Sequence, residues 1–472
     1  MKSKYYTIIL TLSLLCASCS DFLTEEPISD LTAGSFWKTD KDAEVGIVAI
    51  YSAFSKAISP GMWDWGELRA DNYIPHDKDA FDQKEMIYNN IQVDNQAALW
   101  TDLYSVISRA NAAIKYIPRI TMTPNKKNNL QAEAYALRAW AYFYCVRVWG
   151  DVPLYTEPIE EISQGIYRER TDKNIIFQEV ILPDLEKAYY LIDKTSTVRT
   201  RINVATICAL TMDVNAWLHD YEKVVSTMKE KVQILNKRNW GLSALTPETF
   251  AKDWRAIFIE DNQAETPIEV IFKLAYDQLG NGENQSINYF ASSQPRVFLS
   301  DKIKGMYGIL DKRFGSTQWE DIGEGKTQLK KKFWPDGTIF VGTGRVYSDN
   351  DLVLYRYADI VLLYAEALNA LDRTPEAITE LNRTRTRSGE NPFYASDFVS
   401  SDEILDAILE ERQKEFVGEG KHWYDIRRMK DGDLAKALQI NVTGDLVEKH
   451  LLWPIDATVM SKDPQVEQTP GY

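Results

Sequence analysis

The charged residues between positions 410 and 428 are of the types that acid–base catalysis needs. They lie in two adjoining helical patterns and comprise Glu410, Glu411, Arg412, Glu415, Arg427 and Arg428. A glycoside hydrolase needs two carboxyl groups that face a cleft at a separation of about 5 to 9.5 Å. Charges on neighbouring helices most simply pair across the helical hairpin, so we interpret this cluster as ion pairs. An all-helical hydrolase remains the alternative.

Metal and nucleic-acid chemistry have little support in the sequence. The histidines, His76, His219, His422 and His450, are scattered and have no Cys, Asp or Glu at ligand spacing. The net charge of -15 argues against a nucleic-acid partner, because phosphate would be repelled. We therefore predict no metal and no other cofactor.

A second group of polar and aromatic residues lies between Met62 and Asn95, where no helical or strand period is sustained. Its aromatic and imidazole residues are Trp63, Trp65, Tyr73, His76, Phe81 and Tyr88, and its polar residues include Asp64, Asp71, Asn72, Asn89 and Asn90. A loop of this length in a compact domain is usually functional or disordered, and the aromatic content argues against disorder. We therefore expect a functional loop over residues 62–95.

Helical patterns before and after this loop must position it. They occur at residues 40–58, 97–117, 128–149, 172–193, 204–219 and 221–235, with a further pair at 355–389 and later helices at 402–417 and 421–431. Ser59-Pro60-Gly61 is expected to end the first helix. In the pair at 355–389, Thr374 is placed to cap the second helix and Pro375 to occupy its first position.

The first eight of these helices pair naturally as four hairpins, with the fourth hairpin contributed from far downstream. A helical hairpin cannot bury its apolar face alone, so the four must stack as helical repeats do. Between residues 240 and 350 the helical period fails; Ile268–Leu274 suits a strand and Phe333–Val341 contains a hairpin signal. We predict a mainly α protein: four tetratricopeptide-like hairpins plus an irregular lobe with a few short strands. A length of 472 residues favours two intimately packed lobes.

The N-terminus has the layout of a secretory signal. Lys2 and Lys4 precede an apolar run, and the small residues Ala17 and Ser18 lead into Cys19. The run, from Tyr6 to Leu15, is shorter than the about 20 residues that span a bilayer, so we expect cleavage. A cysteine at this place resembles the lipobox of bacterial lipoproteins, although Cys16 stands where Leu, Val or Ile is usual. The alternative is an ordinary secretory signal followed by a chance cysteine.

Two cysteines remain after removal of the signal and modification of Cys19. Cys145 and Cys208 both lie in helical patterns, and we predict buried free thiols. A disulfide stays open as the alternative, because the sequence does not show their separation.

Several segments together resemble the SusD/RagB family of outer-membrane lipoproteins from Bacteroidetes. They are CSDFLTEEP after the lipobox, AEAYALRAWAYFYCVRVWGDVPL at 132–154, RYADIVLLYAEALNAL with LNRTRTRSG, ILEERQKEFVGEGKHWYDIRRM at 408–429 and the closing LLWPIDATVMSKDPQVEQTPGY. The segments follow the order of the family and span nearly the whole chain.

The resemblance implies a domain organisation and a function. It implies a signal peptide at 1–18, a helical region at 19–240 that includes the ligand loop 62–95, an irregular ligand-facing lobe at 241–350 and a C-terminal region at 351–472. Such proteins are binding proteins, not enzymes, and cover a SusC-type TonB-dependent barrel at the outer membrane. They capture oligosaccharides for import or, in the RagB branch, peptides. We therefore expect a lipid-anchored protein exposed to the exterior, with an oligosaccharide ligand and a SusC-like partner.

Glycan capture also indicates which residues should bind. Aromatic faces stack on sugar rings, and amides or carboxylates reach the hydroxyl groups. In an extended segment Trp63 and Trp65 would point the same way and form a platform; the alternative is that they pack the loop onto the first helix. The other candidates are Asp71, Asn72, Tyr73, Tyr88 and Asn90 in the loop, with Asp71 also a possible loop anchor, and Tyr289, Arg296 and Trp319 in the irregular lobe. Trp140, Trp149 and Trp423 are assigned to the core.

Overall fold

The computed structural model describes residues 36–76, 81–160, 166–232, 240–243, 245, 249–258, 267–276, 289–290, 295–314, 319–329, 341–342, 345–346, 351–429 and 451–472. The predicted signal sequence and Cys19 lie outside these ranges, as does nearly all of the hairpin predicted at Phe333–Val341.

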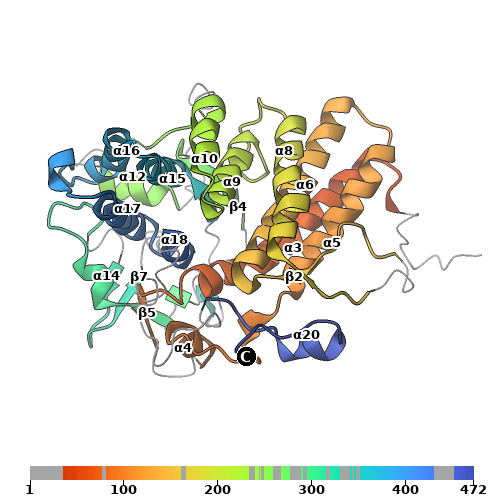
Figure 1. Ribbon diagram of the computed structural model, residues 1–472, viewed down its shortest axis with the longest axis horizontal. Helices are drawn as coiled ribbons and strands as arrows, with labels where there is room; N and C mark the ends of the chain where they lie inside the picture. The colour runs from red at the N-terminus through yellow and green to blue at the C-terminus, as the bar shows by residue number, and fades with distance from the viewer. Residues whose placement is uncertain are drawn as a thin grey trace, which may run out of the picture.

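Helices packed side by side form most of the body (Figure 1). In chain order they are α3 (Asp40–Gly66), α5 (Thr101–Tyr116), α6 (Pro124–Trp149), α8 (Leu182–Leu191), α9 (Val204–Trp217), α10 (Tyr221–Thr227), α15 (Tyr357–Ala370) and α16 (Thr374–Arg387). Each packs against the next, and α3 packs on α6 as well as on α5. α15 packs against α10 although more than a hundred residues separate them. The mainly α prediction is confirmed, including the late contribution of the last hairpin.

The first helix extends further than the sequence predicts. α3 continues through Ser59-Pro60-Gly61 to Gly66, so the end expected at Gly61 is wrong. Pro60 removes one backbone donor, which ordinarily disfavours a helix interior. Every residue from Gly61 to Gly66 is buried, and this burial outweighs the local cost. Gly61 also allows the close approach of Trp65, because a Cβ at this position would collide with the indole ring.

Two other helices depart from a regular α-helical path. The segment predicted at 172–193 comprises α7 (Lys173–Ile176), a π-helical turn at Phe177–Ile181 and then α8, with Pro183 in its first turn. A second π-helical turn at Met228–Val232 follows α10. α16 begins one residue earlier than predicted. Thr374 is its first residue and Pro375 its second, so neither lies at the predicted position, and the cap residue, Arg373, makes no side-chain cap hydrogen bond.

The loop predicted over residues 62–95 contains regular elements. After α3 ends, β1 (Tyr73–Pro75) and α4 (Phe81–Ile87) follow, and the short 3-10 helix η1 (Gln96–Ala98) precedes α5. The prediction of one long irregular loop is therefore wrong. The sequence around β1 does not reveal this strand, because the strand with which it pairs lies more than two hundred residues later in the chain.

The described strands form two-stranded antiparallel pairs. β1 pairs with β5 (Val297–Leu299), β2 (Val152–Pro153) with β3 (Arg170–Thr171), β4 (Val270–Leu274) with β10 (Leu352–Arg356), β6 (Trp319–Asp321) with β7 (Thr327–Leu329) and β8 (Val341–Gly342) with β9 (Arg345–Val346). The strand predicted at Ile268–Leu274 is confirmed as β4. Further α-helices are α12 (Phe250–Ala256), α14 (Asp301–Gly305), α17 (Ser401–Phe416), α18 (His422–Met429) and α20 (Ala457–Lys462), and short 3-10 helices lie at Ile117–Arg119 and Ala395–Asp397.

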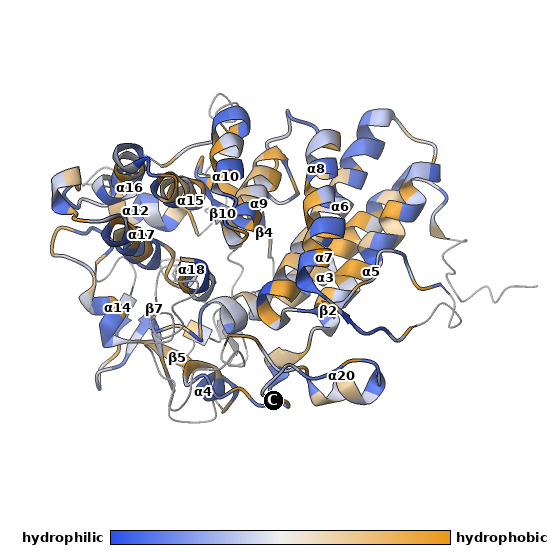
Figure 2. Cartoon of the chain, viewed as in Figure 1, coloured by the Kyte–Doolittle hydropathy of each residue, from blue (hydrophilic) through white to orange (hydrophobic). Residues whose placement is uncertain are grey.

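The core extends through the helical body, where Figure 2 shows hydrophobic residues gathered between α3, α5 and α6. Trp140, Trp149 and Trp423 are buried in it, as predicted. Cys145 and Cys208 are buried and free, so the thiol prediction is confirmed. Among the described helices only α3 is long and apolar enough to cross a membrane, and 56% of its most apolar window is buried inside this body.

Candidate ligand-binding face

The two tryptophans of the predicted platform lie in the last turns of α3, where the protein encloses both. Trp63 is 0% exposed, packs against Tyr289 and Phe290, and donates its indole N–H to the carbonyl of Gly418 at 3.0 Å. Trp65 is 4% exposed and donates to the carbonyl of Ala97 at 2.8 Å. An enclosed ring has no free face for a sugar, so the extended surface platform is wrong. Both rings pack inside the protein, but as part of α3 itself and not as a loop laid onto it.

Glu67, one turn beyond these tryptophans, fixes the chain that leaves α3. Its Oε1 accepts hydrogen bonds from the side-chain amide of Asn72 at 2.9 Å and from the backbone N–H of Gly418 at 2.9 Å. Its Oε2 accepts from the N–H of Gly420 at 3.0 Å, and the Tyr73 hydroxyl lies 3.3 Å from Oε1. One buried carboxylate thus joins residues 67–73 to the loop between α17 and α18. The sequence analysis did not select Glu67.

Asp71 and Asn72 are also anchors. Gln413 donates to Asp71 at 3.0 Å and to the side-chain oxygen of Asn72 at 2.8 Å. Nε2 of His422 donates to Asp71 at 2.9 Å, and Lys302 forms an ion pair with the second carboxylate oxygen. Burial alone would raise the pKa of Asp71, but the hydrogen bond and charge of His422, with those of Lys302, hold it well below its usual value. The alternative role for Asp71, anchoring the loop, is the one that this geometry supports.

The β1–β5 pair brings the irregular lobe against this anchored segment. Tyr73, Ile74 and Pro75 pair with Leu299, Phe298 and Val297. The pairing continues beyond the strands, since the N–H of His76 donates to the carbonyl of Arg296 at 2.9 Å. Arg296 is therefore held beside residues 73–76, and α4 packs against β1 from the other direction.

Tyr289 lies beneath Arg296 and is buried. Its hydroxyl is 2.8 Å from Oδ1 and 2.9 Å from Oδ2 of Asp64, and the Arg296 guanidinium lies 4.9 Å from the centre of its ring. Burial raises the pKa of Asp64 to about 7, while Tyr289 and Arg296 oppose the shift. Trp319, the third candidate in this lobe, is 9% exposed and packs against Tyr307 and Phe314, of which Phe314 is 52% exposed.

Three predicted site residues are exposed: Tyr88, Asn90 and Arg296. Tyr88 and Asn90 follow α4 directly, and the intervening Asn89 has a φ of 52° and is buried against Arg69. Two exposed apolar residues accompany them, Ile74 on β1 and Phe81 at the start of α4. The β1–β5 pairing and the packing of α4 on β1 bring the segments that carry these five residues together. We call the five residues the ligand face, as the candidate surface for ligand binding. The sequence contains Phe81 and Ile74 but gives no sign that their side chains stay outside.

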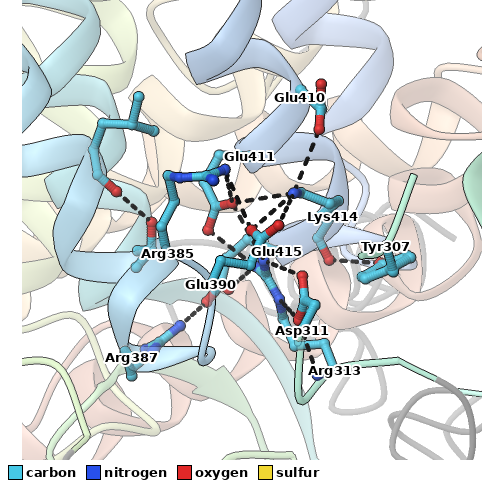
Figure 3. Close-up of polar contacts among 12 residues, drawn as sticks. Tyr307, Asp311, Arg313, Arg385, Arg387, Glu390, Glu410, Glu411, Lys414 and Glu415 are labelled. Atoms are coloured by element: carbon cyan, nitrogen blue, oxygen red, sulfur yellow. Dashed lines mark hydrogen bonds and ion pairs between the residues drawn. The ribbon is translucent and has the colours of Figure 1, made fainter. Parts of the chain in front are cut away.

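In the charged cluster of α17 and α18, ion pairs form as predicted at Glu410, Glu411, Arg412, Glu415 and Arg428, while Arg427 donates to the carbonyl of Arg147. Many of the partners come from other parts of the chain (Figure 3). Arg313 is 0% exposed and binds Glu411 at 3.0 Å and Glu415 at 2.7 Å. Arg356 binds Glu415 as well, and Arg412 binds Asp359 at 2.8 Å. Further pairs join Glu410 to Lys414 and Arg428 to Glu366. Enclosed carboxylates that arginines neutralise are not placed to face a substrate.

The part of the chain that the structure describes contains no group of three or more His, Cys, Asp or Glu side chains placed to hold a metal ion.

Sequence comparisons match one segment in each half of the chain to a protein family. Residues 326–472 match the SusD family, and residues 38–212 match a family described as starch-binding and associating with the outer membrane. SusD-like protein P38 of Formosa agariphila is 29% identical over 99% of this chain and 98% of its own length. SusD-like protein P2 of the same organism is 27% identical over 91% of both chains.

Solved structures show the same fold. A SusD superfamily protein from Bacteroides thetaiotaomicron aligns with a TM-score of 0.76 at 21% identity and covers 92% of this chain and 99% of its own. NanU of B. fragilis aligns with a TM-score of 0.75 at 22% identity, covering 95% and 99%.

Proposed function

Because the chain belongs to the SusD family, we propose that it is a non-catalytic, lipid-anchored protein that captures oligosaccharides outside the cell. It delivers them to a SusC-type TonB-dependent transporter in the outer membrane. Family membership supports carbohydrate binding and association with the outer membrane. The ligand face supports the place of capture.

The observation that carries the ligand class is the exposed ring of Tyr88 beside the amide of Asn90. A sugar ring has an apolar C–H face and a rim of hydroxyl groups, so a protein binds it with an exposed aromatic ring and nearby polar groups. Arg296 and Phe81 add an exposed charge and a second exposed ring on segments that the β1–β5 pair and the packing of α4 on β1 bring together. Buried hydrogen bonds hold the supporting segment, so little freedom is lost when a ligand binds.

A panel of glycans tests this function directly. Full-length protein in detergent is titrated calorimetrically with glycans of different backbones and compared with a panel of oligopeptides. We expect binding to at least one glycan class, with no release of reducing ends. Binding of peptides alone would replace the proposal by a RagB-like peptide subunit, and release of reducing ends would establish a hydrolase.

The anchor and the partner rest on the N-terminal sequence and the family. Cys19→Ala should prevent acylation, so the protein should move from the outer-membrane fraction to the soluble fraction. Purification of the wild-type protein in mild detergent should recover a SusC-type transporter. Membrane association that persists in Cys19→Ala when no transporter is recovered would contradict the lipid anchor.

A further inference from the structure

A cavity of about 320 Å³ lies between α5, the segment that follows β2, and α20. It shares no lining residue with the ligand face, and α20 lies on the other side of the C-terminus from α4 in Figure 1. Trp100, Tyr104 and Tyr155 supply the aromatic part of its lining, which we call the floor, and Ile159 and Val459 supply aliphatic surface. We call it the α20 cavity.

The aromatic floor of the α20 cavity is fixed in place. The Tyr104 hydroxyl donates to the carbonyl of Pro153 at 2.6 Å, and the Tyr155 hydroxyl donates to the carbonyl of Ile166 at 2.8 Å. The two rings meet edge to face with centroids 5.9 Å apart, and Trp100 lies 5.5 Å from Tyr104. Because both hydroxyls bind backbone groups of the protein, the rings are left to offer apolar surface to a ligand. Rings held in this way lose little entropy when they are covered.

The lining of the cavity also includes exposed polar residues, which we call the rim and whose side chains have no polar partner among the described residues. Thr101, Ser108, Glu157 and Lys462 are exposed, and none of their side chains makes a hydrogen bond or ion pair with another described residue. The rim thus offers two hydroxyls, one carboxylate and one ammonium group. The lining also includes Asp463, whose carboxylate accepts from the backbone N–H groups of Arg168 and Gln465. Because the lining carries charges of both signs, a neutral ligand with both donors and acceptors avoids repulsion from either sign.

Together, the floor and the rim match one chemical class. An acyl chain or an apolar peptide would cover the floor but desolvate the rim without replacing its bonds with water. A pyranose has an apolar face for the rings and hydroxyls for the rim. The volume lies at the lower end of the range for ligand pockets, which fits a short saccharide segment rather than a long chain.

We propose that the α20 cavity is a second saccharide site, which binds a short pyranose segment in addition to the glycan at the ligand face. This site rests on the proposed function, since both would serve the same class of ligand. Two sites on one body bind a long polymer more tightly than a short oligomer, because the second contact is made at high effective concentration. The protein should therefore prefer long chains.

The test fills the cavity without removing any buried contact. Ser108→Trp places a large ring in the cavity from an exposed position on α5, and Ser461→Trp makes the same change on α20 outside the lining. Calorimetry uses a short oligomer and the polymer of the glycan class that the wild type binds. We expect Ser108→Trp to lose one of two oligomer sites and to bind the polymer about tenfold or more weakly. Ser461→Trp should match the wild type.

A second variant and a folding control keep the result interpretable. Glu157→Ala combined with Lys462→Ala removes two polar rim groups and should weaken oligomer binding at the same site. Thermal melts should show that all variants fold. A single oligomer site in the wild type, with polymer affinity unchanged in Ser108→Trp, would overturn the second site and leave the proposed function standing. If the wild type binds no glycan, both are overturned.

Discussion

Nε2 of His422 lies 2.9 Å from Oδ1 of Asp71, although 351 residues separate them in the chain. This contact fixes the segment between α3 and β1 to the start of α18, and Gln413 on α17 donates to the same carboxylate oxygen. The ligand face therefore depends on helices near the C-terminus for its position. The first prediction follows from this dependence.

Asp71→Ala should lower the free energy of unfolding by about 3 kcal/mol, because His422 and Gln413 would keep buried polar atoms without this acceptor. Denaturant titration measures the loss. Asp102→Ala is the control, since Asp102 pairs with Lys56 at the surface and should cost less than about 1 kcal/mol. Equal losses in the two variants would show that the Asp71 contacts are unimportant.

Asp64 predicts a dependence of stability on pH. Burial raises its pKa from 3.8 to about 7 in the folded protein, so between these values the unfolded chain releases a proton that the folded chain retains. The free energy of unfolding should therefore fall as pH rises through this window, by about 1.4 kcal/mol per pH unit from this group. Below pH 3.8 its contribution is fully present, and above pH 7 it is lost.

Asp64→Asn tests this dependence, because the amide keeps an oxygen that can accept from Tyr289 but does not titrate. Unfolding measured from pH 4 to pH 8 should show a flatter profile for the variant. Parallel profiles for the two proteins would show that the carboxyl group is not held protonated.

Trp63→Ala should act on stability and not on ligand contact. The ring is fully enclosed, so its removal leaves a cavity and should cost about 3 to 5 kcal/mol. Phe81→Ala offers the converse, because its side chain is 74% exposed and its loss should cost less than about 0.5 kcal/mol. Chemical denaturation separates the two. A stability loss in Phe81→Ala as large as that in Trp63→Ala would contradict the finding that Trp63 is buried and Phe81 is exposed.

Tyr88→Ala should weaken glycan binding about tenfold, which corresponds to about 1.4 kcal/mol, with little change in stability. Its ring is 52% exposed at the ligand face. Tyr190→Ala is the matched control, since this tyrosine is 83% exposed on α8. Calorimetric titration of a glycan that the wild type binds gives both affinities. If Tyr190→Ala weakens binding as much as Tyr88→Ala does, the assignment of the ligand face is wrong.

Arg313→Ala should be among the most damaging single changes. Asp311, Glu411 and Glu415 all bind this guanidinium and are 0% exposed, so in the variant each of these buried carboxylates would lose a cationic partner. We expect a loss of about 3 to 5 kcal/mol in the free energy of unfolding. Arg373→Ala, which removes an exposed pair with Glu376, should cost less than about 1 kcal/mol.

The helices and their pairing could be read from the sequence because both depend on short-range periodicity. The stripes at 355–389 predict two helices, and α15 and α16 occupy those positions. The same reasoning failed at Pro60, where local signals indicate an end but burial of the following residues keeps the helix intact. A turn signal reflects the backbone preference of a few residues. It carries no information on the contacts that bury those residues in the folded protein.

The candidate site shows the same difference between what local sequence indicates and what folding decides. The sequence identifies Trp63, Tyr88 and Arg296 as residues that could bind a glycan, but residue type does not state which ring is enclosed. Trp63 is covered because Tyr289 and Phe290 come against it from the irregular lobe. Tyr88 stays exposed at the end of α4.

By itself, the sequence determined the helical repeat, the order of its elements and the chemical types available for a ligand, because all three are properties of neighbouring residues. Only the tertiary structure decided that Asp71 pairs with His422 and Lys302 and that Arg313 forms ion pairs with carboxylates of α17. It alone also decided that a cavity forms beside α20. These features join residues that are distant in the chain. Their energy comes from burial and pairing, which exist only once the chain has folded.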